Sequence, residues 1–543
     1  MSATSPTLGI AHDAAGRRGW SRWLTPSLSD CFFVALMTWT FLVSPYGWAQ
    51  LLADGDTGWH IRTGEWILAE GRVPYTDLFS FSKAGQPWFA WEWGSDVWFA
   101  LLHGQFGLKG LALFAGAWIG LFAWLLLRAM LWRGANGMIS ILVTLVAVGA
   151  ASLHYLARPH LFTLLFVPLS LWILDADRRS PSRLVWSLIP LTILWTNLHG
   201  GFLALIAFLG LLTLGTAIES LWNAGWQLGD PRATFAPAMR YGWLTAACSL
   251  STLVNPYGWQ LHQHIAAYLN SDWIKTVVQE FQAPTFRGEG LRQYELLLFA
   301  ALLASAALLA RRRVVEPLWI LFWAHQSLTS ARHVTLFAAL AAPIVAVEAT
   351  RLWDAARQGA PRKSVLAILH SLSRDIGSGM RWSSVWPLVF LGALLAVDEP
   401  LKWPRDFPQE KFPVALVGKH QDLMSHSRLL TSDQWGDYIL YRFWPQQKVF
   451  VDGRSDFFGP RLGNEYLRLT QGGWDWRQIL DRHGFDAALV PLEWPLASLL
   501  KAHPGWRLLS DDGKALVFQK RELTPSQRAS GGLLPAGKIW GRH

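Results

Sequence analysis

The sequence predicts a polytopic α-helical membrane protein with about 11 transmembrane helices and a C-terminal extracytoplasmic α/β domain. Three observations lead to this fold class. The 543 residues are 52% hydrophobic and only 16% charged, whereas a soluble protein usually has about a quarter charged residues. Several apolar runs reach the roughly 20 residues that cross a bilayer as a helix. After about residue 398 these runs stop, and short strand-like and helix-like segments alternate.

Eleven apolar segments are the predicted spans. The first, 31–49, follows a basic leader and is expected to be an uncleaved signal anchor, so residues 1–30 are predicted to be cytoplasmic. The others are 108–127, 139–156, 161–174, 184–196, 202–221, 243–254, 296–309, 317–327, 334–347 and 385–397. Residues 31–397 therefore form the predicted membrane module.

Basic residues cluster in alternate loops between these segments. The clusters are Arg17, Arg18 and Arg22; Arg128 and Arg133; Arg178, Arg179 and Arg183; Arg232 and Arg240; Arg311, Arg312 and Arg313; and Arg351, Arg357, Arg362, Lys363, Arg374 and Arg381. This alternation fits the positive-inside rule for cytoplasmic loops. It also explains the net charge of +10, so no nucleic-acid partner is predicted. Cys31 and Cys248 both lie in apolar runs and predict no disulfide framework.

The first outer loop, 51–96, carries the densest polar cluster, Asp54-Gly55-Asp56-Thr57-Gly58-Trp59-His60. A carboxylate beside a membrane span is costly, so the two aspartates are expected to be functional. Helix capping or a charge on the loop surface is the alternative. Three further acids, Asp77, Glu92 and Asp96, are expected to be solvated loop residues. Trp88, Trp91, Trp93 and Trp98 are expected to lie at the membrane interface.

Four more outer loops carry polar residues: 154–160, 195–201, 255–280 and 330–333. Arg158 and Arg332 each lie at the end of a span, on the side where basic residues are sparse. An arginine in that position needs an anionic partner, and a lipid phosphate is the obvious one. Asn255, Pro256 and Gly258 are expected to form a turn.

The C-terminal domain, 398–522, is predicted to be a small three-layer α/β fold. Expected strands are 427–431, 448–451, 487–490, 506–510 and 515–519, and expected helices are 436–443, 461–470, 476–483 and 495–502. Asp452-Gly453-Arg454-Ser455-Asp456 follows a strand and is either a ligand loop or an ordinary turn. Residues 523–543 are predicted to be disordered.

Common motifs of other enzyme and transporter classes are missing from the sequence. It has no Walker-type or dinucleotide Gly-rich loop, no paired CxxC signature, and no HExxH or GxSxG motif. These absences argue against ATP-driven transport and against the common hydrolases.

The motifs that are present resemble membrane glycosyltransferases of fold class C, such as the protein O-mannosyltransferases and the lipid A aminoarabinose transferases. More narrowly, a poorly characterised bacterial subgroup is similar in Asp54-x-Asp56-x-x-Trp59-His60-Ile61-x-x-Gly64, Pro74-x-x-Asp77-x-Phe79-Ser80, Trp88, Trp195-x-Asn197-x-His199-Gly200-Gly201, Asn255-Pro256-Tyr257-Gly258 and Arg332-His333. The resemblance covers about residues 30–520. It implies transfer of a sugar from a polyprenyl-phosphate donor to a lipid, glycan or protein acceptor, on the outer face of a bacterial inner membrane.

Such a reaction needs a carboxylate that takes the proton of the acceptor hydroxyl, and a cationic cradle for the departing phosphate. Asp54 and Asp56 are the catalytic candidates. The substrate-binding candidates are His60, Arg158, His160, His199, Arg332 and His333. Spacing alone does not say which aspartate is the base. In the resembled class the base commonly starts the first loop, which implies Asp54, with Asp56 binding substrate or, together with His60, a divalent metal.

Two other functions compete with this interpretation. A lipid or solute transporter would carry polar residues near the middle of its spans, but here they gather at one face. A non-catalytic membrane assembly protein could dispense with the first-loop acids, which are present. Both comparisons favour an enzyme.

Overall fold

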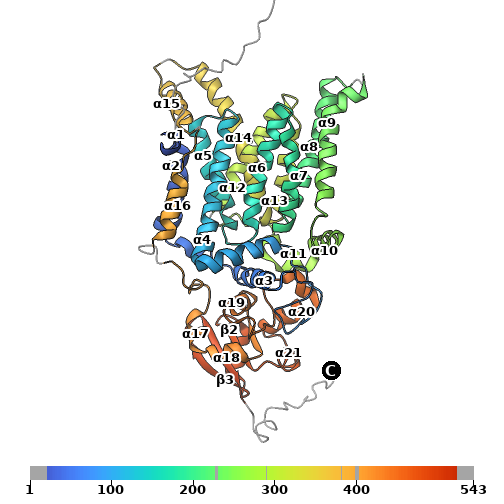
Figure 1. Cartoon of the computed structure of the whole chain (residues 1–543), viewed down its shortest axis with the longest axis vertical. Helices are drawn as coiled ribbons and strands as arrows, with labels where there is room; N and C mark the ends of the chain where they lie inside the picture. The colour runs from blue at the N-terminus through green and yellow to red at the C-terminus, as the bar shows by residue number, and fades with distance from the viewer. Residues whose placement is uncertain are drawn as a thin grey trace, which may run out of the picture.

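The computed structural model describes residues 21–226, 230–288, 290–361, 363–380, 382–397 and 403–521. It has a bundle of long helices and, at one end of the bundle, a smaller part that contains the sheet (Figure 1). The predicted tail, most of the leader, Arg362 and Arg381 lie outside the described residues.

Helices α1 to α16 make up the bundle and its edges. Their bounds are α1 Ser21–Leu24, α2 Leu28–Thr38, α3 Asp56–Glu70, α4 Trp93–Trp132, α5 Gly137–Ala151, α6 His160–Arg179, α7 Leu188–Leu198, α8 Phe202–Asn223, α9 Pro231–Ser251, α10 Trp259–Asn270, α11 Asp272–Val277, α12 Leu291–Leu309, α13 Val315–Thr329, α14 Val334–Gln358, α15 Val365–Gly379 and α16 Trp386–Ala396. Short turns of other helix types lie between them: η1 Trp39–Val43, η2 Gly47–Gln50, η3 Ser152–His154, η4 Arg183–Ser187, η5 Gln279–Phe281 and η6 Ala331–His333.

Six of the described helices are long and apolar enough to cross a membrane: Trp93–Trp132, Gly137–His154, His160–Arg179, Phe202–Asn223, Leu291–Leu309 and Ala331–Gln358. Two shorter apolar helices, Leu28–Val43 and Trp386–Ala396, lie beside them. The predicted count of about eleven spans is therefore not confirmed. The difference arises because several predicted segments form helices shorter than a bilayer crossing needs, such as α7 with 11 residues and α13 with 15.

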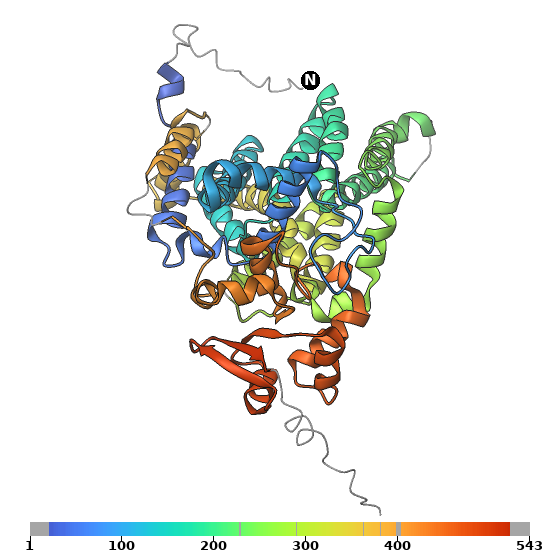
Figure 2. The same cartoon turned by 60° about the horizontal axis from the view of Figure 1, so that its bottom comes forward.

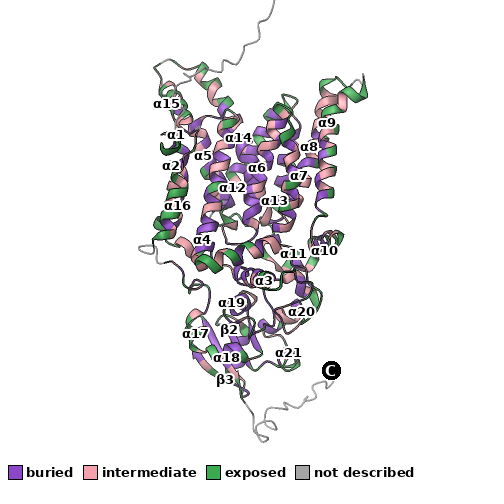
Figure 3. Cartoon of the chain, in the orientation of Figure 1, coloured by how far each residue is buried: buried purple, intermediate pink, exposed green. Residues whose placement is uncertain are grey.

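The core of the bundle lies along α4 and α14, in which 78% of the most apolar window is buried. Figure 3 shows this as buried ribbon in the middle of the bundle, with exposed residues at its edges. Within α4, Gly107 adopts φ 61° and ψ −156° and separates a first segment from the long second one. Glycine reaches that backbone conformation without a steric penalty. The first segment packs against α3, where a Cβ on Gly64 would lie 1.9 Å from the carbonyl oxygen of Asp96.

The C-terminal part contains α17 Val414–Lys419, α18 Gln421–His426, β1 Leu429–Thr431, α19 Asp433–Phe443, α20 Ser455–Thr470, α21 Trp476–His483, β2 Ala487–Pro491, α22 Pro495–Ala502, β3 Trp506–Asp511 and β4 Ala515–Lys520. Its sheet has the order β1-β2-β4-β3. Strand β1 is parallel to β2, and the other two pairs are antiparallel. Four of the five predicted strands and all four predicted helices are confirmed.

The fifth predicted strand, 448–451, is not a strand of this sheet. Val449 instead forms a parallel bridge with Ser80 of the first outer loop, with hydrogen bonds of 2.9 and 3.0 Å to the backbone of Phe81 and Phe79. The loop between α3 and α4 is thus paired with the C-terminal part. It also reaches α10, where the Phe89 and His264 rings stack 4.7 Å apart; Figure 2 shows the blue loop beside the green helix.

Candidate active site

The two candidate catalytic aspartates share one arginine. Asp54 precedes helix α3, and Asp56 is its first residue. Arg158, from the turn between α5 and α6, places one Nη atom 3.1 Å from Asp54 and the other 2.7 Å from Asp56. The anionic partner expected for this arginine is therefore supplied by the chain itself. A planar guanidinium binds two carboxylates in a fixed geometry, so Arg158 sets their relative positions.

Helix α19 of the C-terminal part packs directly on this acid motif. The backbone N–H of Gly55 donates to the side chain of Gln434 at 2.8 Å. A Cβ on Gly55 would lie 2.3 Å from the Gln434 carbonyl oxygen, and one on Gly58 would lie 2.6 Å from that of Asp437. Only glycine allows two backbones to approach so closely. The glycines of the motif are thus the contact surface for α19.

Asp56 and Asp437 face each other across Gly453. Asp437 is fully buried, and its Oδ1 accepts the backbone N–H of Gly453 at 3.1 Å. A Cβ on Gly453 would lie 1.9 Å from Asp56 Oδ1 and 3.0 Å from Asp437 Oδ2. Neither of these two oxygens has a hydrogen-bond partner. Burial raises the pKa of Asp56 to about 7, against the opposing effect of Arg158, and burial followed by the charge of Asp56 raises the pKa of Asp437.

His60 lies one turn farther along α3, among residues that were expected to be solvated. Its Nδ1 is 2.5 Å from Asp96 Oδ1, and its Nε2 is 3.8 Å from Glu92. Asp96 is fully buried, and the Glu92 side chain is only 13% exposed, so the prediction of solvated acids is wrong here. No sequence pattern predicted this burial, because residues 71–92 resemble an ordinary polar loop. In the structure they fold back and bring the start of α4 onto α3.

His199 and His160 complete the histidine group. His199 ends α7 and places Nε2 3.5 Å from Glu92. The ring of His160 lies 6.4 Å from that of His199, and its Nε2 donates to the His154 carbonyl oxygen at 2.5 Å. Three of the predicted substrate-binding residues, His60, His160 and His199, thus lie in one group.

Arg332 approaches from a further element, the turn before α14. Its Nη2 lies 4.0 Å from Glu280, and its guanidinium lies 4.3 Å from the centre of the Phe281 ring. Its Nη1 is buried without a hydrogen-bond partner. Burial alone would raise the pKa of Glu280, but the charges of Arg332 and Arg158 outweigh it and lower this pKa to about 2. Both predicted arginines therefore act on one carboxylate, which the sequence had placed only at the end of a loop.

His333 is directed elsewhere. Its Nδ1 donates to the Gln326 carbonyl oxygen at 3.2 Å, and its ring packs edge-on against Trp323 at 5.9 Å. Both partners belong to α13. A substrate-binding role for His333 stays a prediction, and its contacts describe a helix-end packing residue.

Asp77, the third acid of the first loop, is also buried and not solvated. It accepts Arg454 Nη2 at 2.8 Å, and Asp452 accepts the same atom at 2.6 Å. The guanidinium lies between aromatic rings, 4.5 Å from the centre of Trp88 and 5.0 Å from that of Phe79. The loop 452–456 therefore joins the C-terminal part to the first outer loop. Its position after an expected strand was the only signal of this contact.

Other predictions about the loops have mixed outcomes. The turn at Asn255 and Gly258 is confirmed, with a 3.2 Å hydrogen bond from the Gly258 N–H to the Asn255 carbonyl oxygen. Trp98 is 41% exposed, as an interface residue would be, whereas Trp88 is only 4% exposed. Trp93 donates from Nε1 to Asn197 at 2.8 Å. The prediction that Trp88 lies at the membrane interface is therefore wrong, because the guanidinium of Arg454 lies over the face of its ring.

The predicted metal ligands are engaged by other partners. An ion on Asp56 and His60 would have to compete with Arg158 for the first and with Asp96 for the second. Among the described residues, no group of three or more His, Cys, Asp or Glu side chains is arranged to hold an ion. The donor set does not fit a metal site, and we derive no step through one. Metal dependence stays a prediction that chelation tests.

Comparisons with known proteins identify the fold. No protein-family model matches the sequence, and no curated protein matches it. Among solved structures, the archaeal oligosaccharyltransferase AglB from Archaeoglobus fulgidus, in complex with an inhibitory peptide and a dolichol-phosphate, is similar with a TM-score of 0.52 and 10% identity, over 91% of this chain and 74% of that chain. An oligosaccharyltransferase from the same organism, tethered with an acceptor peptide containing the NVT sequon, gives a TM-score of 0.50 and 10% identity over the same shares. The chain thus shares the fold of these membrane oligosaccharyltransferases, as the resemblance to fold class C implied.

Proposed function

We propose that this protein transfers a sugar from a polyprenyl-phosphate donor to a lipid, glycan or protein acceptor. The reaction takes place at the end of the bundle that carries Asp54, Arg158 and Arg332. In a bacterial inner membrane this end is extracytoplasmic, because the arginine clusters of α4, α6 and α14 lie at the opposite end. Nucleotide sugars are confined to the cytoplasm, so a lipid-linked donor suits this face.

One juxtaposition carries the proposal. Two aspartates and two arginines from three different chain segments meet at one end of a fold shared with oligosaccharyltransferases, and both arginines lower the pKa of Glu280. A base and a cation for the leaving group are the two requirements of glycosyl transfer from a phosphate. A shared fold alone would not assign an activity.

Asp54 is the proposed base. Its side chain is 14% exposed against 7% for Asp56, whose free oxygen is turned toward Gly453. Asp54 takes the proton of the acceptor hydroxyl as the acceptor oxygen bonds to the anomeric carbon. The bond from that carbon to the phosphate oxygen breaks, and polyprenyl phosphate leaves. Arg332 is the proposed partner of the departing phosphate, because its Nη1 is unpartnered while Arg158 is held by two carboxylates.

The test is a transfer assay on the purified protein with a polyprenyl-phosphate sugar and a panel of acceptors. Asp54→Asn is expected to abolish turnover and to leave donor binding nearly unchanged, because the amide cannot take a proton at neutral pH. Asp272→Asn, an exposed acid on α11 at the same end, is the matched control and keeps full activity.

Two outcomes would change the assignment. Full activity of Asp54→Asn together with loss in Asp56→Asn would transfer the role of base to Asp56. If the protein fails to bind polyprenyl phosphate and transfers no sugar to any acceptor class, the proposed function is wrong. Activity that survives exhaustive chelation would show that the predicted metal is not required for transfer.

A further inference from the structure

Glu92 lies between two histidines that come from other parts of the chain. It is the residue before α4, and its two carboxyl oxygens face different rings. Oε1 lies 3.5 Å from His199 Nε2 at the end of α7, and Oε2 lies 3.8 Å from His60 Nε2 in α3. Neither histidine forms an ion pair with Asp54 or Arg158. The three side chains therefore form a separate group beside that pair.

Hydrogen bonding fixes where His199 carries its proton. Its Nδ1 accepts the backbone N–H of Gly201 at 2.9 Å, and a backbone N–H can only donate. Thr163 Oγ1 lies 2.7 Å from the same nitrogen and itself accepts Trp195 Nε1–H at 2.8 Å. Burial lowers the pKa of His199 to about 3, so the ring is neutral. The single ring proton is therefore on Nε2, which points at Glu92.

His60 also directs its Nε2 at Glu92, toward the other carboxyl oxygen. Its Nδ1 is 2.5 Å from Asp96 Oδ1, and because burial raises the pKa of Asp96, either of these two atoms can carry the proton between them. Burial holds the pKa of His60 well below its usual range, so the ring is neutral. Nε2 is buried without a hydrogen-bond partner. Its 3.8 Å separation from Glu92 Oε2 is too long for a direct hydrogen bond.

We propose that Glu92, His60 and His199 bind a hydroxyl group of the donor sugar. A hydroxyl both donates and accepts, so it bridges the gap between Glu92 Oε2 and His60 Nε2 whichever of the two carries a proton. His199 Nε2 faces the other oxygen of Glu92 at 3.5 Å. Resting on the proposed function, this names a sugar-binding group distinct from the phosphate partner Arg332.

The chemistry of the group favours a hydroxyl over the phosphate. Burial raises the pKa of Glu92 to about 8. Two neutral imidazoles and this carboxyl group offer no positive charge to a phosphate, whereas Arg332 offers a guanidinium with an unpartnered nitrogen. The side chains of Glu92 and His199 keep 13% and 15% exposure, so they remain accessible from the site. The ring of Trp91 lies beside Gly200, where a Cβ would be 3.0 Å from it, and gives a neighbouring apolar face for sugar C–H groups.

Calorimetric measurements of lipid binding to the full-length protein and its variants in nanodiscs test this proposal. The two probes are polyprenyl phosphate and the same lipid carrying a single sugar. Glu92→Gln is expected to weaken binding of the sugar-bearing lipid up to about tenfold, the upper end of what one hydrogen bond contributes, because the amide replaces Oε2 or Oε1 with an NH2 group. It leaves binding of polyprenyl phosphate unchanged. Arg332→Gln weakens both, because both lipids carry the phosphate.

The matched control is Glu65→Gln on α3, which removes a partly exposed carboxylate paired with Arg62 and changes neither affinity. His199→Phe is a second variant, expected to match Glu92→Gln and to add little to it, because both residues serve one hydroxyl. Donor lipids whose sugars each lack one hydroxyl identify the hydroxyl that is bound. The lipid that lacks this hydroxyl is expected to bind the unaltered protein and Glu92→Gln with the same affinity. Equal weakening of both lipids in Glu92→Gln, or none in either, overturns the inference. Failure of the unaltered protein to bind polyprenyl phosphate overturns the proposed function instead.

Discussion

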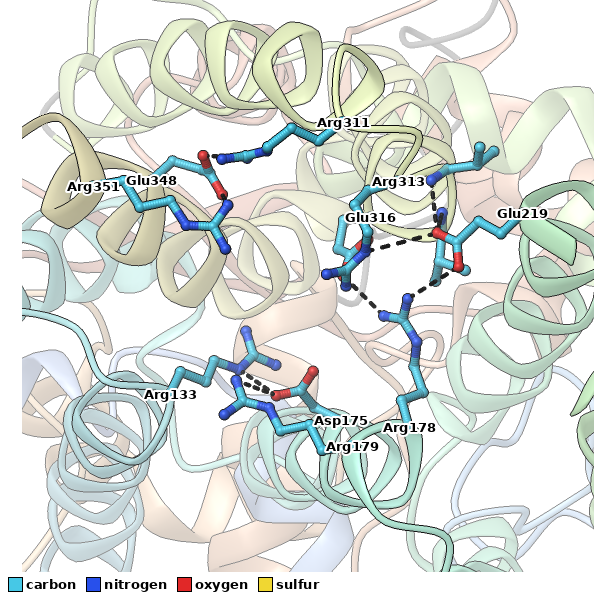
Figure 4. A network of polar contacts seen from close by, with 12 residues as sticks. Arg133, Asp175, Arg178, Arg179, Glu219, Arg311, Arg313, Glu316, Glu348 and Arg351 are labelled. Carbon is cyan, nitrogen blue, oxygen red and sulfur yellow. Dashed lines mark hydrogen bonds and ion pairs between the residues drawn. The ribbon is translucent and has the colours of Figure 1, made fainter. Parts of the chain in front are cut away.

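The two ends of the helical bundle both carry many charges, but they use them differently. At the end away from the C-terminal part, six arginines and four carboxylates form a network (Figure 4). Arg178 lies 2.8 Å from Glu316 and 3.6 Å from Glu219, and Arg133 lies 3.1 Å from Asp175. Each labelled arginine of this network has a carboxylate partner.

At the candidate active site, polar atoms are buried without partners. They are Asp56 Oδ1, His60 Nε2, Asp96 Oδ2, Arg332 Nη1, Asp437 Oδ2 and Arg454 Nη1. Among the labelled residues of the network, Glu316 Oε2 is the buried atom without a hydrogen-bond partner. Buried polar groups are nearly always hydrogen-bonded, so a concentration of exceptions marks a place where something else binds. The comparison separates charges that tie helices together from charges kept available for a ligand.

Arg158→Leu is expected to have the largest effect, because this residue lies in the candidate active site and also pairs two segments of the chain. Its loss leaves Asp54 and Asp56 without their cation, and an unpaired buried charge typically costs about 3 to 5 kcal/mol. Transfer activity is expected to vanish, and thermal unfolding in detergent to occur at a lower temperature. Arg72→Leu, 70% exposed, is the control and changes neither. Normal stability with lost activity would mean that the two acids tolerate the loss of their partner.

Gly453→Ala tests whether the C-terminal part completes the site. The new methyl group would collide with Asp56 Oδ1, so either Asp56 or the loop 452–456 that carries Gly453 must move. We expect transfer to fall by about a hundredfold, the size of effect that a 1 Å misplacement produces. The network lies far along α6, so stability is expected to change less than activity.

Gly418→Ala on α17 is the matched control, since a Cβ there meets no atom within 4 Å. Unchanged activity in Gly453→Ala would show that the contact between Asp56 and the loop 452–456 has no role in transfer.

Sequence patterns predicted those features that a single segment carries. Hydropathy gave the apolar helices, alternation gave four of the strands, and the charge of Arg158 and Arg332 singled them out. Contacts between distant segments carry no such pattern. Gly55 and Gln434 are 379 positions apart and still share a hydrogen bond. Asp437 sits in an amphipathic helix and resembles an ordinary surface acid, and Glu92 is buried only because the loop 71–92 folds back. The predicted number of spans is not confirmed for a related reason, because apolar composition does not fix helix length.

Arg178→Met is expected to lower stability and to spare activity. Arg178 is 11% exposed and pairs with both Glu219 and Glu316. Arg313 stays beside both carboxylates, so we expect a loss of about 2 kcal/mol in the free energy of unfolding, below the usual cost of breaking a buried pair. The measurement is denaturant unfolding in detergent, with transfer activity per folded molecule as the second readout. A fall in that specific activity would mean that the network is coupled to the site.

Arg351→Met is expected to have the smallest effect of all. Its side chain is 50% exposed and lies 3.0 Å from Glu348, three residues earlier on α14. Exposed pairs of this kind contribute about 0 to 1 kcal/mol, and Glu348 keeps Arg311 as a partner. The same unfolding measurement should therefore give nearly the unaltered value. If Arg351→Met costs as much as Arg178→Met, the pairs in Figure 4 do not act separately, and the whole network stabilises the bundle as one cooperative unit. In that case the contrast between the two ends becomes sharper, because one end would gain stability from cooperative ion pairs while the other leaves several atoms unpaired for a ligand.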